Sequence, residues 1–323
     1  MKILSLFNGI SGLHLACDRA GVNVDVCYYS EIDKFANKVT EHHYPSDIAL
    51  GDVTKWREWD IDWASIDFVG AGFPCQAWSV AGQQLGDKDE RGMLFWTTLE
   101  IIKHVLYFNP KAKFLMENVK MKKDFEQYIT HHTEQALGHV EKTLINSALL
   151  SAQNRQRYYW TNFEVTQPDD KGILLCDILD DGIAIEQRPR GKNNGGIHTE
   201  KSPTITSNSW EHNHSVIYRP CERIKEGNEG NIATATDIKG MDCIKRVYGQ
   251  DGKAPTLTTM GGGHREPKVL ISDVLYRKLT PLECERLQTL PCDWTSMLSN
   301  TQRYRSIGNG WTIDVIAHIL KHI

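Results

Sequence analysis

Four short apolar runs, each ending where polar or glycine residues begin, constrain the fold of this chain more than any other feature. They cover residues 2–7, 24–30, 66–71 and 114–116. Runs of this length are typical of buried strands, and helical patterns lie between them. In an open α/β sheet, ligand-binding and catalytic groups gather where strands end. We therefore predict an α/β fold with its functional site at these strand ends.

The first run leads into a glycine turn, Asn8–Gly12, and then into a helix over 13–20 that Gly21 ends. Strand, glycine turn and helix open a nucleotide-binding βαβ unit, in which backbone approaches a ligand at the helix N-terminus. The spacing F-x-G-x-x-G differs from the G-x-G-x-x-G of dinucleotide sites. An NAD-dependent dehydrogenase is therefore disfavoured, and a sharp corner without a ligand stays the alternative.

Carboxylates follow several of these strands. Glu31 lies about 20 residues past the glycines, where an acid can accept hydrogen bonds from ribose hydroxyls. The alternative is a helix N-cap, which Asp33 fits better than Glu31. Asp52 offers another carboxylate at the same edge, and Glu117 follows the run 114–116 as a candidate acid. A solvated loop side chain is the alternative for Glu117.

Cys75 lies in Pro74-Cys75-Gln76, where the run 66–71 ends and a polar loop over 80–92 begins. A lone cysteine is usually a small buried apolar residue. The preceding proline and the polar loop argue against core packing and favour a nucleophile. The position therefore makes Cys75 the candidate reactive group.

The eight cysteines are scattered and include no C-x-x-C pair, which indicates a reducing compartment and argues against structural zinc. His212 and His214 lack further ligands at a suitable spacing. We therefore predict no metal site.

The segment 153–159 is predicted to be a strand, and strand alternation would place Gln153, Arg155 and Arg157 on one face. Two arginines that face the same way suit an anion or a carbonyl oxygen. An exposed strand face without a ligand is the alternative.

The composition changes near residue 181. Gly, Asn, Ser, Thr and Pro dominate as far as about 268, and similar pieces at 202–206, 232–236 and 254–259 indicate short β-segments with glycine loops. Helical order returns at Thr280–Glu283, a capping box with proline at the first helical position. A last helix over 311–322, after a turn at 308–310, would pack back on the first domain. The predicted division is 1–180 plus 303–323, 181–270, and a connecting segment 271–302.

Six motifs occur in an order that is specific although each alone is common. They are Phe7–Gly12, Pro74–Gln76, Glu117–Val119, Gln153-x-Arg155-x-Arg157, the block 277–291 and Gly308–Asn309. In these motifs, and over almost its whole length, the chain resembles the DNA cytosine-5 methyltransferases. The resemblance implies an AdoMet-dependent, Rossmann-like α/β fold with a mixed seven-stranded sheet. It also implies that 1–180 plus 303–323 form the catalytic domain and 181–270 the β-rich target recognition domain.

The resemblance also implies a mechanism. Because cytosine C5 is a weak nucleophile, a Cys75 thiolate would add to C6 and activate it. A free thiol has a pKa near ~8.5, so the site must favour the thiolate or remove its proton. Glu117 would serve N3 and Arg157 would serve O2, with Arg155 beside them in the catalytic set. The target base would have to flip out of the duplex, under a closing loop 80–92.

The ligands and their contacts follow from the same resemblance. The methyl donor would be S-adenosyl-L-methionine (AdoMet), without a metal, and the substrate double-stranded DNA. Phe7 would stack on the adenine, Glu31 hold the ribose and Asp52 the adenine amino group. The whole implied cofactor set is Phe7, Gly9, Gly12, Glu31, Ile32, Asp52, Val53, Pro74, Leu94 and Asn309. The implied DNA contacts are Gln76, Ser79, Arg91, Thr256 and Gly262.

The chain departs from the family pattern at four places. Ser5 stands where an acid is frequent, Asn8 where alanine is frequent, and Leu282 where arginine is usual. Trp311 is bulkier than the usual residue after Gly308-Asn309-Gly310. None of these changes removes a catalytic group, so we expect activity, with altered cofactor contacts near Ser5 and Trp311.

Rival functions differ in their sequence requirements. A methyltransferase for exocyclic amino groups needs a Pro-Pro motif, and the chain has no Pro-Pro pair. A tRNA cytosine-5 enzyme shares the chemistry, but the large insert favours duplex DNA. A silent DNA-binding protein on this fold need not keep Cys75, Glu117, Arg155 and Arg157.

The net charge of −4 carries no nucleic-acid signature, so any DNA binding needs a local basic face. No apolar run approaches the length of about 18 residues that spans a membrane. We expect a cytoplasmic monomer, with a cognate restriction endonuclease as a possible partner.

Overall fold

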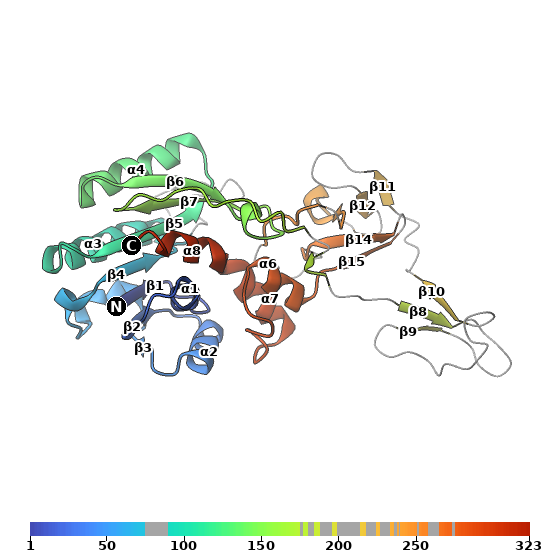
Figure 1. Cartoon of the computed structure of the whole chain (residues 1–323), viewed down its shortest axis with the longest axis horizontal. Helices are drawn as coiled ribbons and strands as arrows, with labels where there is room; N and C mark the ends of the chain where they lie inside the picture. The colour runs from blue at the N-terminus through green and yellow to red at the C-terminus, as the bar shows by residue number, and fades with distance from the viewer. Residues whose placement is uncertain are drawn as a thin grey trace.

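The structure is a computed structural model of the chain. It describes residues 1–74, 90–174, 177–179, 184–187, 196–198, 214–217, 224–226, 233–235, 238, 240–250, 252–257, 265–272 and 275–323. Figure 1 shows a lobe built on a large sheet, with two small sheets at the other end of the long axis. Both chain ends lie in the large lobe.

The large sheet has seven strands in the order β3-β2-β1-β4-β5-β7-β6. Its strands are β1 Lys2–Leu6, β2 Val26–Ser30, β3 Ile48–Ala49, β4 Phe68–Ala71, β5 Lys113–Val119, β6 Glu141–Asn146 and β7 Gln156–Thr161. Strands β1 to β5 pair in parallel, whereas β7 runs antiparallel to both β5 and β6. The predicted mixed α/β sheet is confirmed.

Helices cover both faces of this sheet (Figure 1). They are α1 Gly12–Ala20, α2 Lys34–His43, α3 Glu90–Phe108, α4 Lys123–Leu137, α6 Pro281–Leu287, α7 Asn300–Asn309 and α8 Ile313–Leu320. Strand alternation assigns Ile3 and Leu115 to the buried cluster that includes α1, α6 and α8. Their neighbours Leu4 and Phe114 belong to the cluster that includes α3 and α4.

Local signals set the helix ends where the sequence predicted them. Gly21 ends α1 in the left-handed conformation, with φ 73°. Asp33 caps α2 by accepting a hydrogen bond from the Phe35 backbone N–H. The capping box of α6 is formed by Thr280 and Glu283. Short 3-10 turns cover Val53–Glu58, Trp63–Ser65, Ser147–Leu149 and Asp242–Ile244.

The two small sheets have strand orders β10-β8-β9 and β11-β12-β13-β14-β15. Their strands are β8 Ala184–Gln187, β9 Gly196–His198, β10 His214–Ile217, β11 Ile224–Glu226, β12 Ala233–Ala235, β13 Arg246–Tyr248, β14 Lys268–Ser272 and β15 Leu275–Lys278. Of the three recurring pieces, 232–236 contains β12, and the described residues 254–257 of the third contribute an isolated bridge from Ala254 to Gln153. The piece 202–206 lies outside the described residues.

Several predicted boundaries were wrong. Strand β7 begins at Gln156, because the Arg155 N–H binds Asn146 Oδ1 and the Arg155 carbonyl accepts from Ser147, outside the strand ladder. Helix α3 begins at Glu90, inside the predicted loop 80–92. Helix α7 was missed, and it contains most of the predicted turn 308–310. No helix in the described part of the chain is long and apolar enough to cross a membrane.

Candidate active site

A cavity of about 460 Å³ opens at the ends of β1, β2, β4 and β5. This volume lies in the range of small-molecule sites. Residues predicted for the cofactor that line it are Phe7, Gly9, Glu31, Ile32, Asp52, Val53, Pro74, Leu94 and Asn309, and those predicted for catalysis are Glu117, Arg155 and Arg157. Ile10, Ser30, Asp33, Ala36, Thr54, Gly72, Phe73, Val119, Ser306 and Gly308 also line it, and the sequence analysis did not select them.

The glycine turn forms one wall of the cavity, and Glu31 fixes its shape. Glu31 Oε2 accepts the Gly9 backbone N–H at 2.8 Å, and Oε1 accepts the N–H groups of Ile32 and Asp33, each at 2.8 Å. Phe7 and Gly9 both have φ of 56°, a left-handed conformation that Phe7 adopts only under local constraint. Glu31 therefore holds the turn as well as facing the cavity.

Another part of the lining combines an acid with apolar side chains. Asp52 Oδ1 accepts the Thr54 backbone N–H and the Thr54 hydroxyl, both at 2.9 Å. Ile32, 76% exposed, lies at the rim, and Leu94 from α3 lines the cavity beyond it. The wall thus offers hydrogen-bond acceptors and an apolar surface to the same ligand.

Glu117 and Arg157 form an ion pair on adjacent antiparallel strands. Glu117 lies opposite Tyr159 in the β5–β7 register, and Arg157 is two residues along on the same face. Arg157 Nε lies 3.0 Å from Glu117 Oε1, and the two side chains are 11% and 10% exposed. Burial of a charge is costly unless it is paired, so the two side chains fix each other.

Arg155 is arranged differently from Arg157, although it lines the same cavity. It is 4% exposed, and its guanidinium donates to the carbonyl oxygens of Leu257 at 3.1 Å, Gly308 at 3.4 Å and Gly310 at 2.9 Å. The predicted start of the strand is wrong, because β7 starts after Arg155, although both arginines line the cavity. Arg155 instead links the end of α7 to residue 257.

The nucleophile candidate itself is not described. Cys75, Gln76, Ser79 and Gly262 lie outside the described residues, as does the side chain of Arg91, whose backbone begins α3. Pro74, the last described residue before Cys75, lines the cavity.

Asn118, the residue after Glu117, ties β5 to the segment that leads into Cys75. Its Nδ2 donates to the Phe73 carbonyl at 3.1 Å. The backbone that delivers Cys75 is thereby held beside the strand that carries Glu117.

An open polar groove adjoins the cavity, and Arg157 lines both. Its volume is about 380 Å³, and the other lining residues are Lys120, Asn154, Gln156 and Thr256. Thr256 Oγ1 donates to the Asn154 carbonyl and Lys120 Nζ to Gln156 Oε1, each at 2.8 Å. Lys120 and Asn154 were missed, although Lys120 directly follows the Glu117–Val119 motif.

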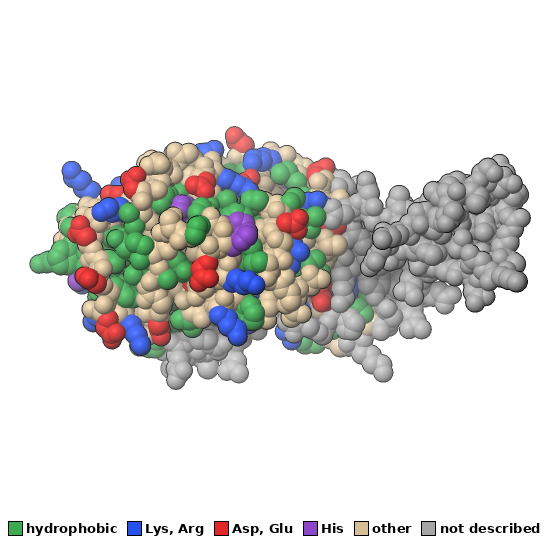
Figure 2. Space-filling model, turned by 90° about the horizontal axis from the view of Figure 1, so that it is seen from below, with side chains coloured by type: hydrophobic (Ala, Val, Ile, Leu, Met, Phe, Trp, Pro, Cys, Tyr) green, Lys and Arg blue, Asp and Glu red, His purple; other side chains and the backbone are tan. Residues whose placement is uncertain are grey.

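One face of the described part carries charges of both signs. On the face seen from below, acidic and basic side chains of the described part are interspersed (Figure 2). Because neighbouring charges of opposite sign cancel at a distance, this face attracts phosphate only weakly.

Ser5 and Asn8, two of the residues that depart from the family pattern, are hydrogen-bonded to each other. Ser5 Oγ donates to Asn8 Oδ1 at 2.8 Å, and Asn8 Nδ2 donates to Thr40 Oγ1 at 3.0 Å.

Gly12, predicted to bind the cofactor, does not line the large cavity but a smaller one of about 50 Å³. A Cβ there would lie 3.5 Å from Ile313 Cδ1, an ordinary van der Waals contact, so the packing of α8 against α1 does not by itself require glycine.

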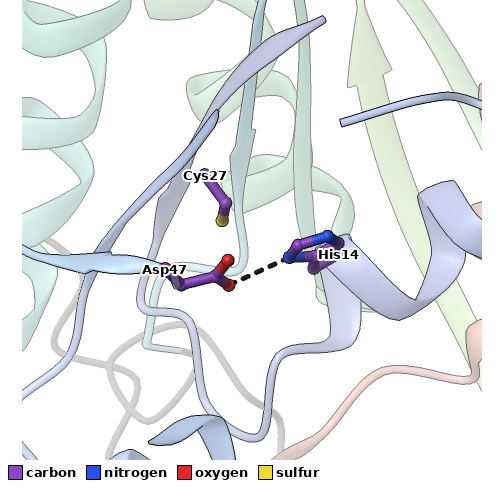
Figure 3. Close-up of side chains that lie close together, drawn as sticks. All are labelled: His14, Cys27 and Asp47. Atoms are coloured by element: carbon purple, nitrogen blue, oxygen red, sulfur yellow. Dashed lines mark hydrogen bonds and ion pairs between the residues drawn. The ribbon is translucent and has the colours of Figure 1, made fainter. Parts of the chain in front are cut away.

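One cluster of potential metal ligands, His14, Cys27 and Asp47, occurs within the described residues (Figure 3). Their ligand atoms lie within 4.8 Å of one another. His14 Nδ1 lies 2.9 Å from Asp47 Oδ2, and its ring stacks on Tyr44. Burial, and then Asp47, raise the pKa of the Cys27 thiol, which therefore keeps its proton. We interpret the cluster as a hydrogen-bonded contact between α1, β2 and the segment before β3, and the absence of a metal stays a prediction.

Comparison with known proteins agrees with this geometry. The profile of the family described as C-5 cytosine-specific DNA methylase matches residues 1–323. The chain belongs to this family. The orphan methyltransferase M.SPBetaI of Bacillus phage SPbeta is 26% identical over 437 aligned residues, which cover 100% of this chain and 97% of the relative. The type II methyltransferase M.NlaX of Neisseria lactamica is 28% identical over 336 residues, covering 100% and 96%.

A solved structure, the methyltransferase EhMeth of Entamoeba histolytica, has a TM-score of 0.65 at 14% identity and covers 100% of this chain and 97% of its own. At that identity the likeness shows the fold alone. The family match makes this protein a DNA cytosine-5 methyltransferase, and the family implies AdoMet as methyl donor.

Proposed function

We propose that this methyltransferase acts on a cytosine that is flipped out of a specific duplex DNA sequence, through a transient bond between Cys75 Sγ and cytosine C6. The observation that carries the proposal is that Arg157 lines both the enclosed cavity and the open polar groove. A base leaving a duplex in the groove would meet Arg157 and Glu117 as it entered the cavity. The cavity wall at Pro74 leads directly to Cys75.

The described residues fit AdoMet. The cavity joins apolar surface from Phe7, Ile32 and Leu94 to the carboxylates of Glu31 and Asp52. Carboxylates accept hydrogen bonds from ribose hydroxyls and an adenine amino group, and they attract the cationic sulfonium and amino groups. When bound, AdoMet supplies the methyl group as an electrophile. Asn309, at the end of α7, would close this pocket.

The proposed covalent step has a balanced course. Cys75 adds to C6 as a thiolate, its S–H proton having passed to solvent or a base, and the C5–C6 double bond opens. C5 thereby becomes nucleophilic and would bond to the methyl carbon of AdoMet as the sulfonium S–CH3 bond breaks and S-adenosylhomocysteine leaves. Loss of the C5 proton restores the double bond and expels the thiolate.

Glu117 and Arg157 are suited to the charge that develops on the ring during this addition. Negative charge spreads toward N3 and O2. Glu117, once its carboxyl group has taken up a proton, would donate to N3, and the Arg157 guanidinium would stabilise the charge at O2. The ion pair at 3.0 Å fixes both groups before the base arrives. Preorganised groups of this kind lose little energy to rearrangement during the reaction.

The DNA would lie between a catalytic domain, residues 1–180 plus 303–323, and a recognition domain, residues 181–270, joined by 271–302. The groove supports this arrangement, because Lys120 and Arg157 come from the first part and Thr256 from the second. We further propose that the enzyme acts as a monomer on cytoplasmic DNA. Relatives include both orphan and type II enzymes, so a restriction partner stays a prediction.

Transfer of labelled methyl groups from AdoMet to duplex DNA tests the proposal, with tRNA as the alternative substrate. We expect 5-methylcytosine in DNA, at one recognised sequence when cellular DNA is bisulfite sequenced. Cys75→Ala should abolish transfer but retain DNA binding. Substantial turnover by Cys75→Ala, or methylation of tRNA alone, would overturn the proposal.

A further inference from the structure

Trp311 lies between Glu117 and the strand end at Gly72 that leads to Cys75. It follows Gly310 and precedes Thr312, the N-cap of α8. Its indole Nε1 donates to Glu117 Oε2 at 3.1 Å, so Glu117 accepts from Trp311 on one oxygen and pairs with Arg157 through the other. The two contacts together restrict rotation of the carboxylate.

The same indole packs across a glycine just before Cys75. A Cβ on Gly72 would lie 2.7 Å from Trp311 Nε1 and 3.1 Å from Cε2. Real Cβ atoms do not approach that closely, so this contact requires glycine at position 72. Trp311 therefore touches both the strand end that leads to Cys75 and the carboxylate of Glu117.

Buried and partly buried hydrogen bonds hold the two residues on either side of Trp311. The Gly310 carbonyl accepts from Arg155 Nη2 at 2.9 Å and from Gln288 Nε2 at 3.2 Å. Thr312 Oγ1 donates to Gln288 Oε1 and accepts from Ser147 Oγ, each at 2.9 Å. A side chain whose flanking residues are fixed in this way is preorganised, as a supporting residue of an active site must be.

We propose that Trp311 is a positioning residue that orients the Glu117 carboxylate toward the target base through its indole N–H. This inference rests on the proposed function of Glu117. The N–H can only donate, so it always presents a donor to Glu117 Oε2. A free carboxylate could rotate about its terminal torsion, which is broad, and the indole removes that freedom. The Trp311 side chain, which is bulkier than the residue usual at this place in the family, then contributes to catalysis by orienting Glu117.

Trp311→Phe tests the proposal because it keeps an aromatic ring beside Gly72 but removes the N–H. We expect kcat to fall about tenfold, in line with loss of a hydrogen bond to a charged group, while AdoMet affinity stays unchanged. In the Glu117→Gln background the same change should lower kcat by less than about twofold, because the carboxylate it positions is absent. Equal effects in both backgrounds would overturn the proposal.

A matched control is Trp160→Phe. Trp160 Nε1 donates to Thr130 Oγ1 at 2.9 Å, away from the cavity lining. This variant should lose thermal stability but keep its kcat. If Trp311→Phe does not fold, site-specific replacement of Trp311 by 3-benzothienylalanine keeps the shape and puts sulfur in place of N–H, and the same tenfold loss is expected.

The outcomes separate this inference from the proposed function. If wild-type protein shows no methyl transfer to cytosine, the proposed function fails. If the wild type is active and the variants without the N–H match its kcat, only the role of Trp311 fails.

Discussion

The strand-end site and the small sheets are built in different ways. At the site, the buried charges of Glu117 and Arg157 are paired, and residues more than 150 positions apart in sequence are hydrogen-bonded to each other. In the described part of the small sheets, the strands are three to five residues long, and Ala235, Ile238 and Val247 form a small buried cluster. The described contacts at the site therefore join segments that are far apart in sequence, and we expect substitutions there to have larger effects than substitutions in the small sheets.

The largest effect expected from this contrast is at Glu117. Glu117→Gln removes the carboxyl group and the charge partner of Arg157, and should lower kcat by about 100-fold or more. AdoMet binding should change much less, because the glycine turn and Glu31 hold the cofactor wall independently. Single-turnover rates and titration calorimetry measure the two quantities. A loss confined to AdoMet affinity would contradict the assigned role.

Arg155 should affect stability more than any residue of the small sheets. Arg155→Ala leaves three buried carbonyl oxygens without this donor, and we expect the free energy of unfolding to fall by about 3 kcal/mol. Arg155→Lys is the matched control, since it keeps the charge but not the planar fork. It should recover part of the stability. Urea unfolding of the three proteins checks this, and an unchanged midpoint for Arg155→Ala would refute the linking role.

The smallest effect on rate and stability should come from the recognition region. Exchange of residues 256–263 for the corresponding segment of a relative should change which DNA sequence is methylated, with kcat and melting temperature nearly unchanged. Thr256 lies in the groove, and the Gly/Thr-rich segment after it is suited to loop readout of bases. Sequencing of the methylated products checks the exchange. An unaltered target sequence would contradict the proposed domain assignment.

The same contrast explains what the sequence could predict. The presence of the buried strands, the Asp33 cap and the α6 capping box follow local patterns, and the structure confirmed them, although β5 extends to Val119 and so includes Glu117. The partners of Arg155 and the hydrogen bond from Trp311 to Glu117 depend on how distant segments meet. No local periodicity encodes such contacts, so the sequence identified the residue types but missed their arrangement.

The Glu117–Arg157 pair could be predicted only in part from the sequence. Both residues were selected from motifs, yet their adjacency depends on the β5–β7 register, which is set by antiparallel pairing across the whole strand. Strand β7 starts after Arg155 because the Arg155 backbone N–H donates to Asn146 Oδ1 instead of to a neighbouring strand. Arg155 therefore lies outside the strand that contains Arg157. The alternation of side chains along a strand does not predict where a polar side chain will take over a backbone hydrogen bond.

Incubation of the full-length enzyme with AdoMet and duplex DNA that carries 5-fluorocytosine at the target position tests the covalent mechanism most directly. Fluorine cannot leave as a proton does, so the thiolate would stay bound to C6. We expect a denaturation-resistant protein–DNA adduct that maps to Cys75. An enzyme that methylates ordinary DNA but never forms this adduct would contradict the account.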